Sequence, residues 1–248
     1  PVNRLIIFEA LAVNAGSLLT PIGNPQNILL WSRSGLSFLG FIGQMAPFGA
    51  AMMLSLLALT WFSFPARDIV KTPNTEGYPY QRPLLLSCVG LYAIFLLCLD
   101  IGLPLYGLLA VFAGFLLLAR RVLLQIDWSL IFVFAAMFID VGLFTRLPPL
   151  QPAFAAIAGL SDGGVYALGV GLSQIVSNVP ATILLLNYAP SSTQLAYAVN
   201  AGGFGLAIGS LANLIALRMA GERKIWLRFH YYSLPLLAWA ALVGWLLS

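Results

Sequence analysis

Two stretches of the chain carry asparagine and glycine at the same spacing. Asn14, Gly23 and Asn27 of the first stretch match Asn200, Gly209 and Asn213 of the second, each 186 residues later. An asparagine amide offers an oxygen that accepts from a donor or binds a cation, and an N–H₂ group that binds an anion. Glycine and proline interrupt a helix, and the freed backbone carbonyls and N–H groups add ligands of both kinds. The repeat therefore predicts two equivalent binding segments for a small polar solute.

The candidate binding residues fall into three groups. The first stretch contributes Asn14, Gly16, Ser17, Thr20, Gly23, Asn24 and Asn27, and the second contributes Asn200, Gly202, Gly203, Gly209, Ser210 and Asn213. A third group, Ser177, Asn178 and Thr182, surrounds Pro180, where a hydroxyl, an amide and a helix N-terminus together suit an anion. The alternative is that small residues only let helices approach closely, which we favour for Gly169 and Gly171. Repetition at one spacing favours binding for the two asparagine stretches.

Two carboxylates lie within apolar segments, where ionisable groups are costly and default to functional candidates. Asp140 could carry a coupling proton or neutralise a sodium ion, and a hydrogen bond or an ion pair with Arg146 is an equal alternative. Glu9 has the same two roles open to it, but snorkelling to the membrane surface or pairing with Arg4 is favoured.

Catalysis has no comparable signal. Ser173, Ser177 and His230 lack an orienting acid or a nucleophile elbow, so we expect no enzyme. His230 is the single histidine and has no cysteine or clustered carboxylate at ligand spacing, which argues against a zinc or haem site. We expect no cofactor beyond sodium or protons as coupling ions, and no nucleic acid partner, because the basic residues lie in short loops beside apolar runs.

The composition places these residues in a lipid bilayer. Of 248 residues, 60% are hydrophobic and 8% are charged, with a mean hydropathy of +0.94, which is more apolar surface than one soluble core can bury. We expect an all-α polytopic protein with seven crossings and one re-entrant hairpin. The crossings lie at 5–31, 36–64, 84–100, 103–119, 128–146, 193–217 and 231–248, the hairpin lies at 164–188, and 150–160 is interfacial.

The distribution of Lys and Arg over this arrangement supplies an orientation. On one side lie Arg4, Arg67, Lys71, Arg82, Arg120, Arg121, Arg218, Arg223, Lys224 and Arg228, whereas the other side has only Arg33 and Arg146. The richer side is cytoplasmic by the positive-inside rule, so 65–83, 120–127 and 218–229 are cytoplasmic and the C-terminus is outside. The broken crossings 5–31 and 193–217 then run in opposite directions, which is typical of inverted-repeat transporters.

The repeat also predicts the organisation of the chain. Residues 1–64 form the remainder of the first repeat, 65–83 form a cytoplasmic loop, and 84–248 contain the linking helices and the second repeat. The second broken crossing is preceded by the hairpin at 164–188, and its counterpart 186 residues earlier would precede residue 1. We therefore expect the N-terminal part of the first repeat to be missing from this chain.

The motif from Asn14 to Asn27, with Ser177-Asn178-Val179-Pro180 as a hairpin tip, resembles the ion transporter superfamily. That superfamily includes arsenite permeases, citrate-transporter-like proteins and NhaD-type sodium/proton antiporters. The resemblance implies a transporter of a bacterial inner membrane, often dimeric, that moves an anion by an elevator-like shift. It also implies ion ligands at Asn14, Asn24, Asn27, Asn178, Asn200 and Asn213. Val179 departs from the Ser-Asn-Thr tip of sodium-coupled dicarboxylate symporters, which leaves proton coupling through Asp140 as a competitor.

These observations lead to one functional hypothesis and two alternatives. The leading hypothesis is a secondary active transporter of a small anion or oxyanion, coupled to sodium or protons. The first alternative is an arsenite or antimonite efflux permease, or a sodium/proton antiporter that uses Asp140. The second, of another class, is a membrane scaffold or inactive fragment that transports nothing.

Overall fold

The computed structural model describes residues 2–65 and 81–248, which form helices joined by turns, with no strand among them. The chain divides into two compact units, residues 1–65 with 135–248 and residues 66–134. Most of the loop predicted at 65–83, including Arg67 and Lys71, lies outside the described residues. All the predicted binding residues belong to the first unit.

The first asparagine stretch is a helix interrupted at 18–24, which we call the first break. It separates α1 (Val2–Ser17) from α2 (Pro25–Ser34). Asn24 has an extended backbone, and its side-chain oxygen accepts the N–H of Asn27 at 2.9 Å. Pro25 follows at the first position of α2, where the missing N–H has no helical partner to lose. The sequence therefore encodes a new helix start at this point.

The second asparagine stretch is interrupted in the same manner at 203–210, the second break. It joins α11 (Thr193–Gly202) to α12 (Leu211–Met219) through the short 3₁₀ turn η2 (Ala207–Gly209). Ser210 caps α12 by accepting the N–H of Ala212. Since α2 begins at Pro25 and α12 at Leu211, the two helix starts are separated by the offset that separates the asparagines.

The segment predicted as a hairpin forms two helices, α9 (Asp162–Val176) and α10 (Asn178–Leu185), which pack on each other. Ser177 joins them with φ 76° and ψ 155°, and it is the one non-glycine residue with positive φ in the described chain. The helix α9 packs closely on α11, because a Cβ at Gly169 would stand 2.8 Å from the Cβ of Ala198. At Gly171 a Cβ would meet nothing within 4 Å, so packing does not require that glycine.

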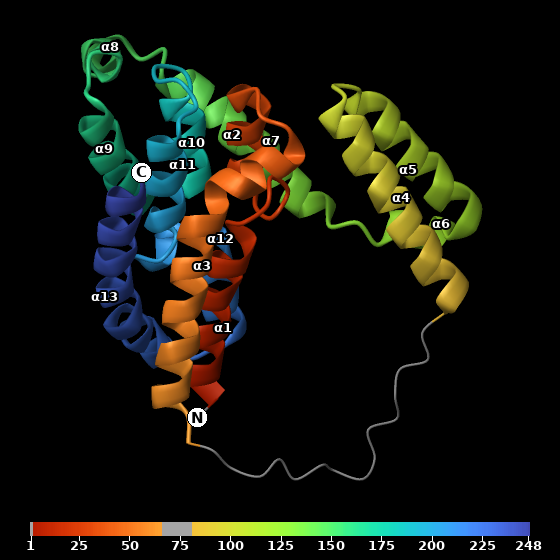
Figure 1. Cartoon of the computed structure of the whole chain (residues 1–248), viewed down its shortest axis with the longest axis horizontal. Helices are drawn as coiled ribbons and strands as arrows, with labels where there is room; N and C mark the ends of the chain where they lie inside the picture. The colour runs from red at the N-terminus through yellow and green to blue at the C-terminus, as the bar shows by residue number, and fades with distance from the viewer. Residues whose placement is uncertain (1, 66–80) are drawn as a thin grey trace. The chain divides into compact units, whose positions relative to one another are not determined.

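Two long helices, α3 (Phe38–Ser63) and α13 (Arg223–Leu247), pack on each other and on α1 and α11 (Figure 1). The stacked rings of Phe48 and Tyr197, with centroids 4.9 Å apart, join α3 to α11. The helix α13 begins at Arg223, eight residues before the start predicted at 231. Ile225 and Phe229, both 0% exposed, give this basic first part an apolar face that an average over the segment conceals.

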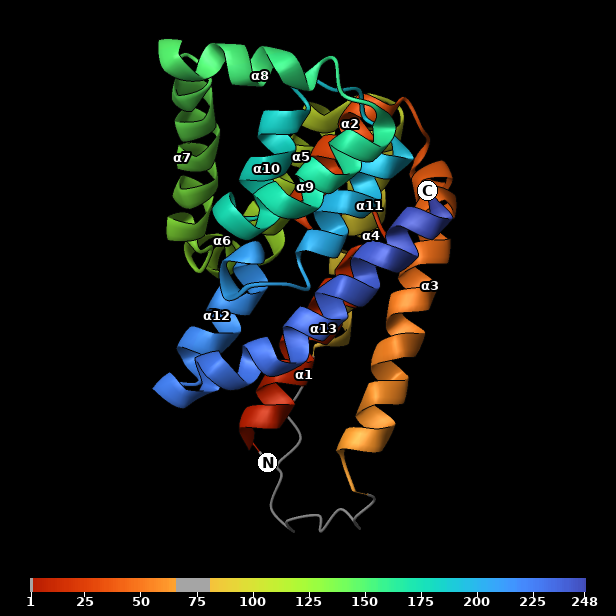
Figure 2. The same ribbon diagram turned by 90° about the vertical axis from the view of Figure 1, so that its left-hand side faces the viewer.

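The remaining helix of this unit is bent. The pair formed by α7 (Trp128–Phe144) and the segment of η1 (Pro148–Leu150) and α8 (Gln151–Ile157) bends by 75°, and Figure 2 shows α8 lying across the end of α7. By length and composition, three described helices can cross a membrane, or four if this bent pair counts as one span. The three are Phe38–Ser63, Arg82–Asp100 and Lys224–Leu247.

The second unit contains α4 (Arg82–Asp100), α5 (Pro104–Leu118) and α6 (Arg120–Leu124). The helices α4 and α5 approach closely, since a Cβ at Gly107 would lie 2.8 Å from the Cβ of Cys98. Gly102, with φ 69–77° typical of left-handed turns in this chain and 77° here, closes the turn between them. The helix α6 occupies part of the segment 120–127 that the sequence predicts as a loop.

Candidate functional site

The four repeated asparagines bond reciprocally between the two breaks. Asn14 Nδ2 donates to Asn213 Oδ1, and Asn200 Nδ2 donates to Asn27 Oδ1, both at 2.8 Å. The four side chains are between 0% and 8% exposed. The first asparagine of each copy is therefore paired with the second asparagine of the other copy.

The residues that cap the two helices after the breaks extend this reciprocity. Ser210 Oγ donates to Asn14 Oδ1 at 2.8 Å, and Asn24 Nδ2 donates to Asn200 Oδ1 at 3.0 Å. Ser210 lies 186 residues after Asn24, so the two bonds are equivalent in the repeat. We refer to the set Asn14, Asn24, Asn27, Asn200, Ser210 and Asn213 as the amide network.

The second asparagine of each copy also holds the backbone of its own break. Asn27 Nδ2 donates to the carbonyls of Leu18 and Thr20 at 2.9 and 3.0 Å, and Asn213 Nδ2 donates to the carbonyl of Gly203 at 2.9 Å. Carbonyls at a helix C-terminus have no partner within the helix. In the described chain these amides supply that partner, so Asn27 and Asn213 fix the shape of the breaks.

Asn178, at the tip between α9 and α10, is different. Its side chain is 2% exposed, and its amide takes part in none of the hydrogen bonds that the structure shows among the described residues. A Cβ built on Gly203 would lie 3.2 Å from Asn178 Nδ2, 3.3 Å from the carbonyl oxygen of Asn200 and 3.4 Å from Asn14 Oδ1. A donor and two acceptors thus converge beside Gly203. No side chain caps α10, whose N-terminus begins at this same asparagine.

The other predicted residues around the tip and the breaks have mainly structural contacts. Thr182, fully buried, donates to the carbonyl of Asn178 one helical turn earlier, and Ser17 Oγ donates to the carbonyl of Asn14. Gly23 has no room for a side chain, because a Cβ would lie 1.9 Å from the carbonyl oxygen of Ser17.

The remaining predicted glycines divide by the space around them. A Cβ at Gly202 would stand 2.3 Å from the Cβ of Ser173, and one at Gly209 would stand 2.7 Å from the carbonyl oxygen of Gly202. At Gly16 the nearest atom, Met53 Cε, would be 3.8 Å away. Close approach therefore explains Gly202 and Gly209 but not Gly16.

Two glutamines join the site that the sequence analysis did not select. Gln174 Nε2 donates to the carbonyl of Gly202 at 2.8 Å, and its Oε1 accepts the N–H of Leu206 at 2.7 Å. Gln26, 3% exposed, donates to Asn200 Oδ1 at 3.4 Å. The available signal was an amide side chain inside an apolar run, three residues before Ser177 in one case and beside Asn27 in the other.

The two predicted carboxylates lie outside the amide network. Asp140 lines an apolar cavity of about 390 Å³ together with Met137, Val141, Phe144, Phe154, Leu172, Val176, Pro180 and Leu184. Glu9 is exposed on α1. Its predicted partner Arg4 instead donates to the carbonyl of Ser63 and lies over the ring of Phe64, 6.0 Å from its centroid.

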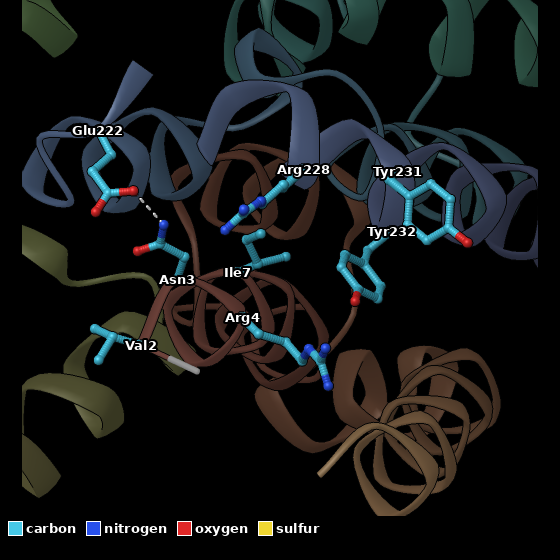
Figure 3. A pocket seen from close by; sticks show the side chains of 8 residues that line it. All are labelled: Val2, Asn3, Arg4, Ile7, Glu222, Arg228, Tyr231 and Tyr232. Carbon is cyan, nitrogen blue, oxygen red and sulfur yellow. Dashed lines mark hydrogen bonds between the residues drawn. The ribbon is translucent and has the colours of Figure 1, made fainter. Parts of the chain in front are cut away.

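A larger cavity, of about 650 Å³, lies between the first turns of α1 and α13 (Figure 3). It is lined by Val2, Asn3, Arg4, Ile7, Glu222, Arg228, Tyr231 and Tyr232, and Asn3 donates to the carboxylate of Glu222 within it. None of these residues belongs to the amide network. No group of three or more His, Cys, Asp or Glu gathers as a metal site anywhere in the described residues.

The arrangement is that of a helical membrane protein with a buried polar site between interrupted helices. Residues 1–194 match the citrate transporter family (CitMHS). The chain is 61% identical over its whole length to the inner membrane protein YbiR of Escherichia coli, and 34% identical over 88% of its length to an uncharacterized transporter of Methanocaldococcus jannaschii. It is also 27% identical over 87% of its length to an uncharacterized transporter of Mycobacterium tuberculosis.

The chain therefore belongs to the citrate transporter family, which confirms the resemblance seen in its motifs. It spans 66%, 58% and 59% of the lengths of these three relatives. The residues that match the family include the first break and the α9–α10 tip.

Proposed function

We propose that this chain is part of a secondary active transporter that binds a small anion or oxyanion between the two breaks and the α9–α10 tip. The observation that carries the proposal is the buried Asn178 amide, which has no hydrogen bond within the described chain and lies beside Gly203 at the uncapped N-terminus of α10. An amide N–H₂ group and a helix N-terminus both favour negative charge.

Coupling to a cation follows from the acceptors on the other side of the same space. The carbonyl oxygen of Asn200 and Asn14 Oδ1 lie 3.3 and 3.4 Å from the position of a Cβ on Gly203, opposite the Asn178 donor. Oxygen ligands of this kind suit sodium or a proton carrier. An anion and a cation bound side by side would each lower the cost of burying the other.

We further propose that the two broken segments form an inverted repeat that moves as one body, and that the full-length protein is a dimer. In both views α1 lies below α2, whereas α11 lies above α12 (Figures 1 and 2). The amide network and Gln174 connect α1, α2, α9, α11 and α12. A set of helices joined in this manner is suited to an elevator-like shift as a unit.

A second candidate is a cation antiporter or an arsenite efflux permease that uses Asp140. It is supported by the position of Asp140 in an apolar cavity that also contains Val176 and Pro180, on either side of the α9–α10 tip. A carboxylate in apolar surroundings favours its protonated form, which is a property of proton carriers.

Ligand-induced stabilisation of the purified full-length protein tests the proposal. A panel of oxyanions and carboxylates, with and without sodium, is screened by thermal unfolding; a ligand at about 100 times its dissociation constant stabilises by about 2.7 kcal/mol. We expect a shift in the wild type, no shift in Asn178→Ala, and an unchanged shift in Ser55→Ala, which removes the hydroxyl that accepts from Trp239 away from the site.

The outcomes separate the candidates. A shift produced by arsenite, or by pH and sodium without any anion, and abolished by Asp140→Asn but not by Asn178→Ala, would replace the anion site with the second candidate. Wild-type protein that is folded but unaffected by every anion, cation and pH would favour a scaffold that transports nothing.

A further inference from the structure

The imidazole of His230 holds the backbone of the second break. His230 Nε2 accepts the N–H of Ala207 at 3.2 Å, and its Nδ1 lies 2.7 Å from the carbonyl oxygen of Trp226. Ala207 begins η2, the turn within the break, and His230 belongs to α13. One side chain therefore ties a long helix to the interrupted one.

The two partners fix the protonation state of the ring. A backbone N–H can only donate, so Nε2 must carry a lone pair, and a carbonyl can only accept, so Nδ1 must carry the proton. The ring is neutral in the tautomer with hydrogen on Nδ1. A second proton would occupy Nε2 and point an N–H at the N–H of Ala207, which abolishes the bond.

The clamp is present in only one of the two copies. In the second break two consecutive N–H groups, of Leu206 and Ala207, are held by side chains from different helices, Gln174 of α9 and His230 of α13. The residue 186 positions before Ala207 is Pro21, which has no N–H to hold. A proton on His230 would therefore act on the second break and leave the first unchanged.

The surroundings of the imidazole add no anion that would stabilise its charged form through a contact. The helix α13 packs on α1, α3, α11 and η2. The ionisable side chains of these elements are Arg4, Glu9 and Tyr197, and α13 itself carries Lys224, Arg228, Tyr231 and Tyr232. Neither ring nitrogen bonds to any of them, and Lys224 and Arg228 lie one and a half turns and half a turn away on the same helix.

We propose that His230 is a positioning residue that fixes the second break only while its imidazole is neutral, so that acidification loosens this break. The proposal rests on the proposed function only where it identifies the second break as part of the binding site. Unperturbed histidine titrates near pH 6.5, which places the change within the range that a membrane protein of a bacterium encounters.

Hydrogen–deuterium exchange of the full-length protein, measured on peptides that cover 203–210, tests it without any transport assay. After correction for the intrinsic effect of pH, we expect the wild type to exchange about five-fold faster at pH 5 than at pH 8, the change for loss of one hydrogen bond. His230→Gln keeps an acceptor that does not titrate, so its protection should not depend on pH. His230→Phe should exchange fast at both values.

Two controls keep the result specific. Gln174→Leu removes the other clamp, so we expect faster exchange of 203–210 at both pH values with the pH dependence retained. Nitrogen-15 NMR of histidine-labelled wild-type protein gives a readout that does not depend on any variant folding. The signal assigned to His230, which disappears in His230→Gln, should show hydrogen on Nδ1 at pH 8.

The proposal is overturned if corrected exchange of the wild type is the same at both pH values, if His230→Gln retains the wild-type pH dependence, or if NMR places the hydrogen on Nε2. These results are independent of ligand binding. Loss of the anion-induced thermal shift with an intact pH-dependent clamp would remove the proposed function and keep His230 as a proton-sensitive contact.

Discussion

Asn14 and Asn200 differ from Asn178 in what their amides are free to do. Asn14 donates to Asn213 and to the carbonyl of Gly203, and accepts from Ser210, whereas Asn200 has the equivalent contacts with Asn27 and Asn24. An amide with these partners positions the breaks, and an amide without them is available to a ligand. The residues with the clearest repeat in the sequence are thus largely structural, and the residue with the strongest case for binding lies outside the repeat.

The reciprocal pairs predict coupled stabilities. Asn14→Ala and Asn213→Ala should each destabilise the protein by about 1–3 kcal/mol, because each leaves a buried partner amide unsatisfied. The double variant should cost less than the sum, with a coupling energy of about 1–2 kcal/mol. The cycle is measured by denaturant unfolding of the full-length protein in detergent, and the Asn200/Asn27 cycle should give the same sign and size.

The control for this cycle combines Asn14→Ala with Tyr166→Phe. Tyr166 donates to the carbonyl of Ala241 and shares no hydrogen-bond partner with Asn14. Their effects should add within about 0.5 kcal/mol. Additive effects in the asparagine pairs would mean that the reciprocal bonds do not stabilise the protein.

Ser177 gives a second prediction at this scale. Its φ of 76° and ψ of 155° lie in a region that glycine adopts readily and other residues at a cost of about 1–3 kcal/mol. Ser177→Gly should therefore raise the unfolding free energy by about 1 kcal/mol, while Ser177→Ala, which keeps the Cβ, should not. Equal stabilities of the two variants would show that the tip is not strained in the protein.

The sequence predicts which residues gather at the site better than it predicts what each one does. The repeat brought Asn14, Asn200 and their partners to one place because matched helix breaks expose matched backbone groups. It could not show the exchange of partners between the copies, which depends on how the two segments face each other. Gln174 was missed because it stands alone in an apolar helix with no repeat to mark it.

At the scale of elements, strong local signals fixed the helix breaks. Two prolines, Gly23 and the capping Asn24 stop one helix and start another within a few residues. The start of α13 had no such signal, since its basic first part lowers the mean hydropathy while Ile225 and Phe229 keep one face apolar. The end of an apolar run is therefore a weaker guide to a helix boundary than a cap or a proline.

Gly23 and Gly16 offer a matched pair for testing the first break. Gly23→Ala should destabilise the full-length protein by about 1–3 kcal/mol, because its Cβ would lie 1.9 Å from a backbone oxygen that cannot move without distorting the break. Gly16→Ala meets only ordinary contact and should be neutral or slightly stabilising, as alanine favours helix over glycine. Denaturant unfolding measures both, and similar losses in the two variants would contradict this account of the break.

At the scale of the whole molecule, the candidate site lies within one unit, residues 1–65 with 135–248, although its parts are far apart in sequence. The bonds from Asn14 to Asn213 and from Asn27 to Asn200 join residues 199 and 173 positions apart. The intervening residues 66–134 form a unit of their own. Such an organisation is expected of a chain whose two halves must fold before their shared site exists.

The orientation of the chain in the membrane is the prediction that this organisation makes most directly. Only three or four continuous helices are long enough to cross, so an odd number of crossings depends on counting both broken segments and on treating α9 and α10 as a hairpin that returns to its own side. We therefore expect a reporter joined after Ser248 to be extracytoplasmic and one joined after Gln125 to be cytoplasmic. Alkaline phosphatase should be active only in the first fusion, and green fluorescent protein should fluoresce only in the second. If Ser248 instead proves cytoplasmic while Gln125 is unchanged, one of the three interrupted segments crosses differently. The two breaks could then not have opposite orientations with α9–α10 entering from one side.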